Sequence, residues 1–376
     1  MNRLPRRSLL AIVMQLATAA GGAAVARPAP VASGQLGLAV PLHELVDSFG
    51  GDMSATFAQY ARLGVRWVRT DFWWNQVQPA ANGGYAFSAL DRVVTNANRH
   101  GIKIVAELQG LPQWVSGTGG VASAANKSAY VSFAAAAARH FRGKVRYWEI
   151  WNEPNLQGFW GAQPDAADYT RLLKAAYTAI KAVDPDTVVI TGGLSPAPET
   201  AGDHVGAVEF FKQMYANGAH GFFDAVGFHP YSWPLMPGDP ASWNGFRIMR
   251  TDIRDTMVAN GDGAKRVWIT EFGAPTNGSR AVTERQQAAN LEQASEFAHA
   301  TPWAGPLFWY TYQDRGGSTA DTENWFGLVG PKGEHKLSYR AYRDIAGDRL
   351  KAGRSGKAET RDGEASSRSR PTDPGL

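Results

Sequence analysis

The stretch Tyr147–Asn155 reads YWEIWNEPN, an apolar run that ends in polar residues. Its aromatic and β-branched side chains favour a strand, and its proline, which has no backbone N–H, ends that strand. The stretch therefore carries Asn152 and Glu153, flanked by aromatic side chains, to the end of a buried strand. A second apolar run, Val267–Gly273 (VWITEFG), presents Glu271 in the same way.

Similar apolar runs alternate with helical patterns along the rest of the chain. The expected strands are Gln35–Val40, Val65–Thr70, Ile102–Leu108, Val145–Trp151, Thr187–Thr191, Phe223–His229, Val267–Glu271 and Leu307–Tyr312. The expected helices are Met53–Leu63, Ser88–His100, Lys127–Phe141, Asp165–Val183, Val208–Asn217, one within Phe246–Asn260, Thr283–His299 and Tyr339–Arg349. Eight strand–helix units without a Pro/Gly-rich linker predict an α/β fold, a single (β/α)8 TIM barrel. An open, doubly wound sheet is the alternative.

The strand count places the two glutamates at one end of the barrel. Glu153 follows the fourth expected strand and Glu271 ends the seventh, and barrel active sites lie at the carboxyl ends of the strands. Retaining glycosidases use two carboxyl groups roughly 5–5.5 Å apart, one as general acid/base and one as nucleophile. Either glutamate alone could be a solvated carboxylate at a strand end. The pair predicts a retaining glycosidase.

The segment Trp148–Leu156, followed by Phe159 and Trp160, resembles the acid/base segment of glycoside hydrolase family 39. Leu63–Arg69 (LGVRWVR) and Leu111–Trp114 (LPQW) resemble the ends of the second and third strands of that family. Family 39 includes β-xylosidases and endoglycosidases of biofilm polysaccharides, and belongs to a clan of (β/α)8 retaining glycosidases. The Asn-Glu-Pro core is shared with sister families such as the family 5 cellulases.

This resemblance implies that Glu153 is the general acid/base and Glu271 the nucleophile. The acid/base must be protonated to donate to the leaving oxygen and ionised to activate water, whereas the nucleophile must stay ionised. Asn152 is expected to donate to the sugar 2-hydroxyl, although an Asn beside a proline can also serve the turn alone. Arg69 is expected to hold Glu271 ionised, with an ion pair to Asp71 as the alternative.

The resemblance also assigns binding roles near the later strand ends. Tyr231 is expected to hydrogen-bond the nucleophile, His229 to line the site, and Trp309 to be the sugar platform, because aromatic rings suit the apolar face of a pyranose. Trp114 and Trp160 are further candidates for sugar binding. Trp73, Trp233 and Trp325 are candidates in the same way, and each of these five tryptophans could instead belong to the core.

Two positions depart from the expected pattern. Glu107 lies near the end of the third strand, where related enzymes often have His or Asp, and it could bind a sugar hydroxyl or be a structural acid. Phe272 and Gly273, after the nucleophile, differ from the β-xylosidase pattern. The specificity of the xylosidases is therefore not transferred to this chain.

Other chemistries find no support in the residues. The eight histidines are scattered without ligand spacing, so neither a metal nor a cofactor is expected, and the chain has no Gly-x-Ser-x-Gly elbow of a serine esterase. Of the formal charge of +4, residues 1–26 contribute +3 and residues 351–376 contribute +2, which leaves −1 for the body. A near-neutral body gives no electrostatic footprint for nucleic acid.

The two ends of the 376-residue chain differ in composition from the body. Residues 1–26 combine Arg6-Arg7 with an apolar run and Ala24-Val25-Ala26, which predicts a twin-arginine-like export signal, or alternatively an uncleaved anchor. Residues 351–376 are rich in Gly, Ser, Arg and Pro and predict a disordered tail, with a cell-wall or polyanion tether as the alternative. Without cysteine, an exported domain of this size relies on its core.

The sequence thus predicts an exported bacterial enzyme, secreted, periplasmic or associated with the cell wall, with a catalytic domain over 27–350. It is expected to be a monomer without stable membrane insertion once the signal is cleaved. Its predicted activity is hydrolysis of a polysaccharide or oligosaccharide with retention of configuration. A catalytically silent carbohydrate-binding barrel and a transglycosylase are the alternatives.

Overall fold

The computed structural model describes residues 36–47, 52–116, 121 and 123–347. The predicted signal (1–26) and tail (351–376) lie outside these residues and stay predictions. Within the described ranges, no helix is both long and apolar enough to cross a membrane.

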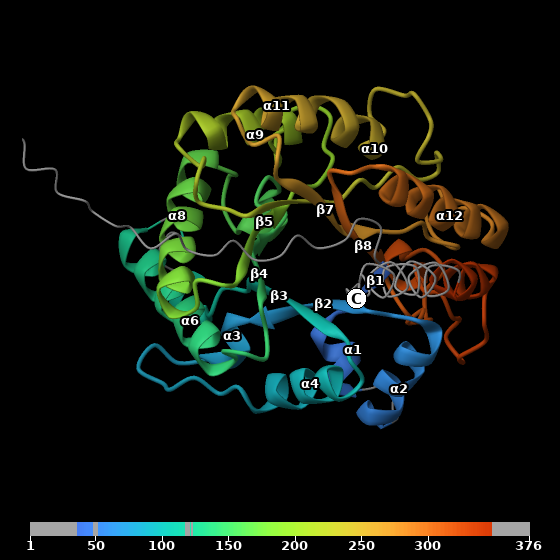
Figure 1. Ribbon diagram of the computed structural model, residues 1–376, viewed down its shortest axis with the longest axis horizontal. Helices are drawn as coiled ribbons and strands as arrows, with labels where there is room; N and C mark the ends of the chain where they lie inside the picture. The colour runs from blue at the N-terminus through green and yellow to red at the C-terminus, as the bar shows by residue number, and fades with distance from the viewer. Residues whose placement is uncertain (1–35, 48–51, 117–120, 122, 348–376) are drawn as a thin grey trace, which may run out of the picture.

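Eight parallel strands close into a barrel in which each strand pairs with its neighbours in sequence, and β8 pairs with β1 (Figure 1). The strands are β1 (Leu36–Ala39), β2 (Trp67–Trp73), β3 (Lys103–Gln109), β4 (Tyr147–Asn152), β5 (Val188–Gly193), β6 (Ala225–Phe228), β7 (Arg266–Phe272) and β8 (Ala304–Tyr310). The predicted TIM barrel is therefore confirmed, and the open sheet is excluded.

The helices surround the barrel in Figure 1 and follow the predicted alternation. The longer ones are α2 (Met53–Leu63), α4 (Ser88–Arg99), α6 (Ala124–His140), α8 (Ala166–Val183), α9 (Ala207–Ala216) and α12 (Glu284–Ala300). Residues 337–347 are also helical. The helix after the seventh strand begins with a capping box, in which the side chains of Thr283 and Gln286 accept hydrogen bonds from each other's backbone N–H groups.

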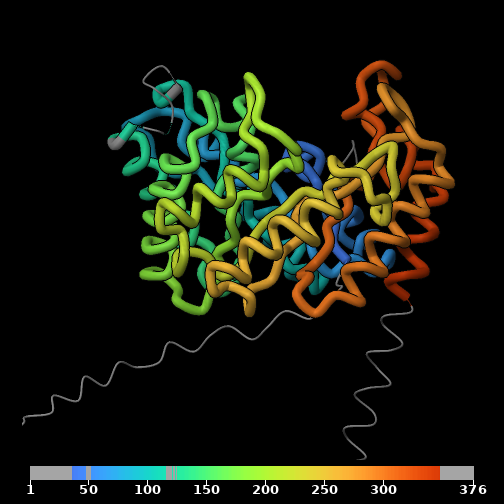
Figure 2. Tube along the Cα trace, turned by 90° about the horizontal axis from the view of Figure 1, so that it is seen from above, coloured from blue at the N-terminus to red at the C-terminus, as the bar shows by residue number. Residues whose placement is uncertain are grey.

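Shorter helical segments lie between the main elements. They are α1 (Leu42–Asp47), α3 (Trp74–Val77), α5 (Gln113–Ser116), α7 (Gln157–Trp160), α10 (Gly245–Ile248), α11 (Arg254–Ala259) and the 3-10 turn η4 (Thr322–Trp325). The helix predicted within Phe246–Asn260 is divided, because the π-helical turn η3 (Met249–Ile253) joins α10 to α11. In Figure 2, the segments that follow β5 (yellow-green) and β8 (orange-red) extend to the same edge of the molecule.

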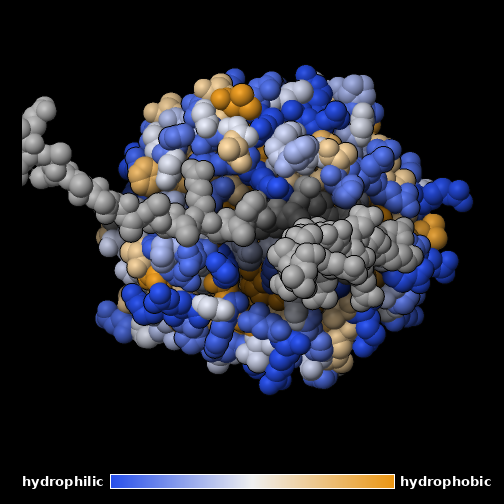
Figure 3. Space-filling model, in the orientation of Figure 1, coloured by the Kyte–Doolittle hydropathy of each residue, from blue (hydrophilic) through white to orange (hydrophobic). Residues whose placement is uncertain are grey.

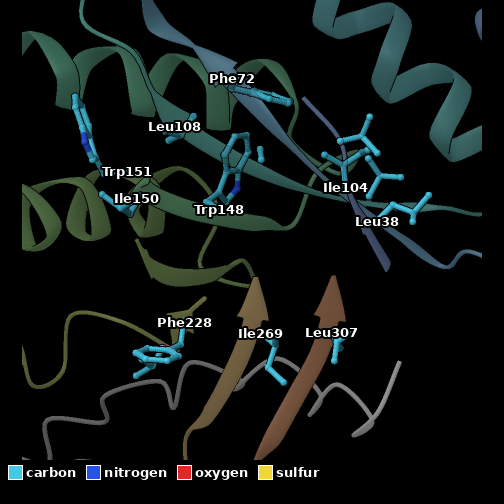
Figure 4. Packing of buried hydrophobic residues seen from close by; sticks show 14 of the residues in the cluster. Leu38, Phe72, Ile104, Leu108, Trp148, Ile150, Trp151, Phe228, Ile269 and Leu307 are labelled. Carbon is cyan, nitrogen blue, oxygen red and sulfur yellow. The ribbon is translucent and has the colours of Figure 1, made fainter. Parts of the chain in front are cut away.

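Two apolar layers hold the barrel together. Inside it, Trp67, Trp268 and Phe308 pack edge-to-face or stacked against one another, 5.5–6.4 Å between ring centroids. Outside it, alternate residues of the strands form the second layer, and Figure 4 shows Ile104 and Ile269 among the residues of this layer. The filled interior makes the barrel a core rather than a pore, so a substrate can be bound only at its rim.

Candidate active site

The end of β4 has an irregular backbone that decides which side chains enter the site. Trp151 has a φ of 72° and Glu153 a φ of 39°, both in the left-handed region that ordinary residues avoid. Ile150 and Trp151 both pack into the outer layer, so the alternation of the strand breaks there. Asn152 consequently turns inward, where its Oδ1 accepts a hydrogen bond from Arg69. Strain of this kind is typical of functional sites and costs on the order of 1–3 kcal/mol per residue.

His229, just after β6, contacts both glutamates. Its Nδ1 lies 2.9 Å from Oε1 of Glu153 and 3.6 Å from Oε2 of Glu271. These two carboxylate oxygens can therefore be no farther apart than the sum of the two distances, 6.5 Å. Carboxyl groups that are close together belong to the retaining geometry, because inverting enzymes leave room for a water at roughly 6.5–9.5 Å.

The ring of His229 can reach this position because β5 ends in glycine. A Cβ built on Gly193 would lie 2.1 Å from Nε2 of His229 and 2.6 Å from Oγ1 of Thr270. A side chain at this position would clash with the imidazole and displace it from its place beside Glu153. The backbone carbonyl of Gly193 also accepts a hydrogen bond from the N–H of Glu153, so the end of β5 fixes both partners.

Glu271, near the carboxyl end of β7, is surrounded by donors. The Tyr231 hydroxyl donates to its Oε2 at 2.9 Å, and Nη1 of Arg69 donates to its Oε1 at 2.6 Å. Burial alone would raise the pKa of Glu271, but the charges of His229 and Arg69 and the hydrogen bonds from Tyr231 and Arg69 outweigh it. The pKa of this carboxyl is therefore lowered, which keeps it ionised.

Arg69, on β2, is the centre of a buried cluster of charges. Besides Glu271, its guanidinium lies 2.6 Å from Glu149 and 2.7 Å from Glu107, on β4 and β3. Asp71 belongs to a different contact and accepts hydrogen bonds from the Leu42 N–H and the Gln109 side chain. The alternative ion pair of Arg69 with Asp71 is thus not formed.

Glu107 has a structural position in this cluster. Its side chain is fully buried against Arg69, and burial raises its pKa well above the ordinary value. A sugar in the cleft cannot reach a carboxylate that lies beneath Arg69. Of the two roles open for Glu107 from sequence, the structure supports the structural acid.

A cleft of about 920 Å³ lies above the two glutamates. The carboxyl ends of all eight strands, or the segments that follow them, contribute to its walls: Pro41, His43, Asp71, Trp73, Gln109, Asn152, Glu153, Phe159, Ser195, Pro196, Ala197, Pro198, Tyr231, Trp233, Trp243, Glu271, Arg280, Tyr310, Arg315, Glu323 and Phe326. The face seen in Figure 3 is mainly hydrophilic, with some apolar side chains visible toward its centre. A cleft with aromatic walls and two central carboxyl groups has the composition of a sugar-binding site.

A model of the cellulase family (glycosyl hydrolase family 5) matches residues 37–305 of the chain. The chain belongs to this family of glycosyl hydrolases. Its members and those of family 39 share the (β/α)8 clan, so the predicted clan is confirmed. The family model that matches is that of family 5, while a family 39 enzyme is among the most similar structures.

That structure is a family 39 glycoside hydrolase from Bacteroides cellulosilyticus, 25% identical, with a TM-score of 0.68. The alignment covers 85% of this chain and 64% of the Bacteroides protein, so the present chain spans less than two thirds of its length. A monomeric β-xylosidase from Caulobacter crescentus is 21% identical with a TM-score of 0.61, over 84% and 69% of the two chains. An exo-β-1,4-mannosidase from an Opitutaceae bacterium is 18% identical with a TM-score of 0.63, over 87% and 61%. The last two show the fold alone.

In this family 5 glycosyl hydrolase, the prediction that Trp309 is the sugar platform is wrong. Trp309 is fully buried in the outer layer, its Nε1 donates to the Phe326 carbonyl, and its ring packs edge-on against Phe272. Side chains alternate along β8, so the residues on either side of Trp309 point the opposite way. Phe308 faces the barrel interior and Tyr310 faces the cleft. Tyr310, the next residue along, lines the cleft instead.

Two other tryptophans proposed for sugar binding also lie away from the cleft. Trp160 is buried between Trp151 and Tyr169, and so belongs to the core. Trp114 donates from Nε1 to the carbonyl of Gln78 and packs edge-on against another indole, that of Trp74. Both predictions fail because α5 and α7 turn these indoles toward the helices.

The remaining tryptophans divide between the two roles. Trp73 and Trp233 line the cleft, whereas Trp325 donates from its Nε1 to the Ser318 carbonyl and does not line it. Trp243 lines the cleft, but nothing in its sequence neighbourhood singled it out. Other cleft residues that sequence reasoning missed are His43, Gln109, Phe159, Arg280, Arg315, Glu323 and Phe326. Tyr310 was missed as well, because the alternation of β8 can be read from the sequence but its phase cannot.

Among the described residues, no group of three or more His, Cys, Asp or Glu side chains is arranged to hold a metal ion. The clustered carboxyl groups instead contact the side chains of Arg69 and His229. The residues present offer acid–base and nucleophilic chemistry.

Glu44, on α1, adds a pH-dependent contact under the cleft. Arg315 lies 2.9 Å from its Oε1, and burial, opposed by the hydrogen bond and charge of Arg315, raises its pKa from 4.5 to about 7. Between those values the folded protein holds a proton that the unfolded chain releases, so this contribution to stability is lost as the pH rises through about 7.

We therefore expect Glu44→Gln to flatten the pH dependence of stability between about pH 4.5 and pH 7. The wild type should lose up to about 3 kcal/mol of unfolding free energy over this range from Glu44 alone. Urea unfolding at several pH values measures the effect, with the exposed Glu209→Gln as control. Parallel pH profiles for wild type and Glu44→Gln would contradict the assignment.

Proposed function

We propose that this protein is a retaining glycoside hydrolase that cleaves O-glycosidic bonds of a polysaccharide or oligosaccharide by double displacement. One observation carries the proposal: His229 brings Glu153 and Glu271 within 6.5 Å of each other, the sum of its distances to the two carboxylates. The two groups have different surroundings: Glu271 is held by donors from Arg69 and Tyr231, whereas among the described residues Glu153 forms its ion pair with the His229 imidazole. Such a division suits a nucleophile and an acid/base.

In the first step, an oxygen of Glu271 attacks the anomeric carbon while Glu153 donates its proton to the departing glycosidic oxygen. The C–O bond to the leaving sugar breaks, and a covalent glycosyl–Glu271 ester forms. In the second step, Glu153 takes a proton from water, whose oxygen attacks the anomeric carbon and releases Glu271. Two inversions leave the configuration unchanged.

Asn152 is oriented for the sugar by Arg69. Because Nη2 of Arg69 donates to Oδ1 of Asn152 at 2.8 Å, the amide group is held with its Nδ2 turned away from Arg69. An Nδ2 donor in the cleft, adjacent to Glu153, is suited to the sugar 2-hydroxyl, a contact that strengthens in the transition state. Tyr231 and Arg69 hold Glu271 ready for attack.

The same residues serve a transglycosylase when a sugar acceptor outcompetes water, and a silent binding barrel would not need both carboxyl groups. We further propose that the enzyme is exported, on the pattern of residues 1–26, and that it acts as a monomer. The substrate is a neutral or weakly charged glycan, for which aromatic walls and hydroxyl-binding polar groups are suited.

Digestion of a broad glycan panel tests the function. We expect reducing sugar to be released from at least one glycan, and NMR during the first minutes to show a product with the anomeric configuration of the substrate. An inverted product would overturn the double displacement. Binding of a glycan without any release of sugar would favour the silent barrel, and longer products than the substrate would favour transglycosylation.

A further inference from the structure

The cleft extends to both sides of the line between the two glutamates. Glu153 follows β4 and Glu271 lies on β7, so the ring of eight strands places β5 and β6 on one side of that line and β8, β1, β2 and β3 on the other. Trp233 and Trp243, after β6, line the first side, and Trp73, the last residue of β2, lines the second.

We propose that Trp243, together with Trp233 and Arg280, forms a sugar-binding platform for glycosyl units beyond the scissile bond. With the opposite side of the cleft also open to sugar, the protein binds a chain that continues in both directions and cuts it internally. This inference rests on the proposed glycosidase function and names its substrate as a chain rather than a terminal disaccharide.

Arg280 joins the loop after β7 to the loop after β6. Its guanidinium lies over the indole of Trp243, 4.9 Å from the ring centroid, and its Nη2 donates to the Trp233 carbonyl at 3.0 Å. Among the described residues, no carboxylate forms an ion pair with Arg280. Its positive charge is therefore used to fix the indole and the loop, which makes the platform preorganised.

The backbone at Arg280 supports this role for its side chain. Its φ is 60°, a conformation that glycine adopts without strain and arginine adopts at a cost. A side chain kept at such a position is explained by the two contacts it makes. Because such strained backbone positions cluster at functional sites, the φ of Arg280 supports a functional role for the Arg280–Trp243 pair in the cleft wall.

The platform is continuous with the catalytic centre. The ring of Trp233 packs edge-on against Tyr231, 5.2 Å between centroids, and against Phe326, 5.4 Å. Tyr231 in turn donates to Glu271. A sugar on Trp233 would therefore lie next to the unit that is being cleaved, and Trp243 is linked to Trp233 through Arg280.

The size of the cleft fits several sugar units. Its volume of about 920 Å³ lies near the upper end of the roughly 300–1,000 Å³ typical of small-molecule sites. A single pyranose would fill only part of this space. The walls on the far side of the glutamates, with Trp73, His43 and Arg315, complete a groove that holds a chain across the rim.

Xylohexaose, cellohexaose and mannohexaose test the proposal, with the p-nitrophenyl glycosides of the same three sugars as short substrates. We expect the wild type to cut at least one hexaose at internal bonds, seen by mass spectrometry of products labelled with 18O at the reducing end. Trp243→Ala should lower kcat/KM on that hexaose about tenfold more than on the matching aryl glycoside, while Trp243→Phe retains most of the activity.

Trp303→Ala is the matched control. Trp303 also lies under an arginine, with Arg254 5.3 Å from its ring centroid, but it does not line the cleft. Trp303→Ala should leave unchanged the ratio of kcat/KM on the hexaose to kcat/KM on the aryl glycoside. Equal losses on both substrates for Trp243→Ala, or release of single sugars from one end of every hexaose, would overturn the platform.

The outcomes separate this inference from the function on which it rests. Retaining hydrolysis of aryl glycosides with no cleavage and no calorimetric binding of any hexaose would overturn the platform and leave the glycosidase intact. Absence of hydrolysis on every substrate, including the broad glycan panel, would overturn the glycosidase function itself.

Discussion

Replacing Glu271 with alanine is expected to lower kcat by a factor of about 10⁴ or more. Without this carboxylate no covalent intermediate forms, and the paths that remain lack the positioned nucleophile. The fold should persist, because Arg69 keeps its contacts with Glu107 and Glu149. Initial rates on the best substrate of the glycan panel, together with a thermal unfolding curve, measure both parts of the prediction.

Azide provides a positive test of the same role. The ion can enter the space left by the missing carboxylate and attack the anomeric carbon, which gives a glycosyl azide of inverted configuration while Glu153 still serves as the acid. Glu209→Ala, an exposed glutamate on α9, is the control and should retain full activity. Residual activity of Glu271→Ala within tenfold of the wild type would refute the assignment of the nucleophile.

Replacing Arg69 with methionine is expected to reduce the free energy of unfolding by about 3–5 kcal/mol. The substitution leaves Glu107 and Glu149 fully buried without the guanidinium that lies within 2.7 Å of both. Adding Glu107→Gln and Glu149→Gln to Arg69→Met should recover part of the lost stability, because neutral amides then replace the buried carboxyl groups that have lost the guanidinium. Urea unfolding at pH 7 compares the three proteins.

The activity of the same variants distinguishes structure from catalysis. The rescued triple variant should still have a low kcat, since Glu271 and Asn152 have both lost their contact with Arg69. Lys336→Met, which breaks the buried pair with Asp314 at 2.6 Å, should also destabilise the fold but leave kcat unchanged. Wild-type stability in Arg69→Met would show that the cluster contributes nothing to folding.

The outline of the site could be read from local patterns. Apolar periodicity located eight strands, and an Asn-Glu-Pro ending at Glu153 marked the end of one of them. His229 and Tyr231 directly follow β6 and so face the same cleft. Contacts between such residues follow from the topology, because the carboxyl ends of parallel strands meet at one rim.

The orientation of individual side chains could not be read in the same way. The choice between Trp309 and its neighbour Tyr310 depends on the phase of β8, and β7 beside it shifts register twice. At the end of β4, the positive φ of Trp151 reverses the phase and sends Asn152 inward. Such reversals arise from packing between strands and leave no periodic trace in the sequence.

The sequence by itself determined the barrel and the pairing of Glu153 with Glu271, because strand periodicity is local and strand order then places both at one rim. Only the tertiary structure decided that Glu107 is a buried partner of Arg69 and that Trp243, under Arg280, lines the cleft. These placements depend on which side chains of distant loops and strands meet. That information lies in the packing of the whole barrel and in no single stretch of the chain.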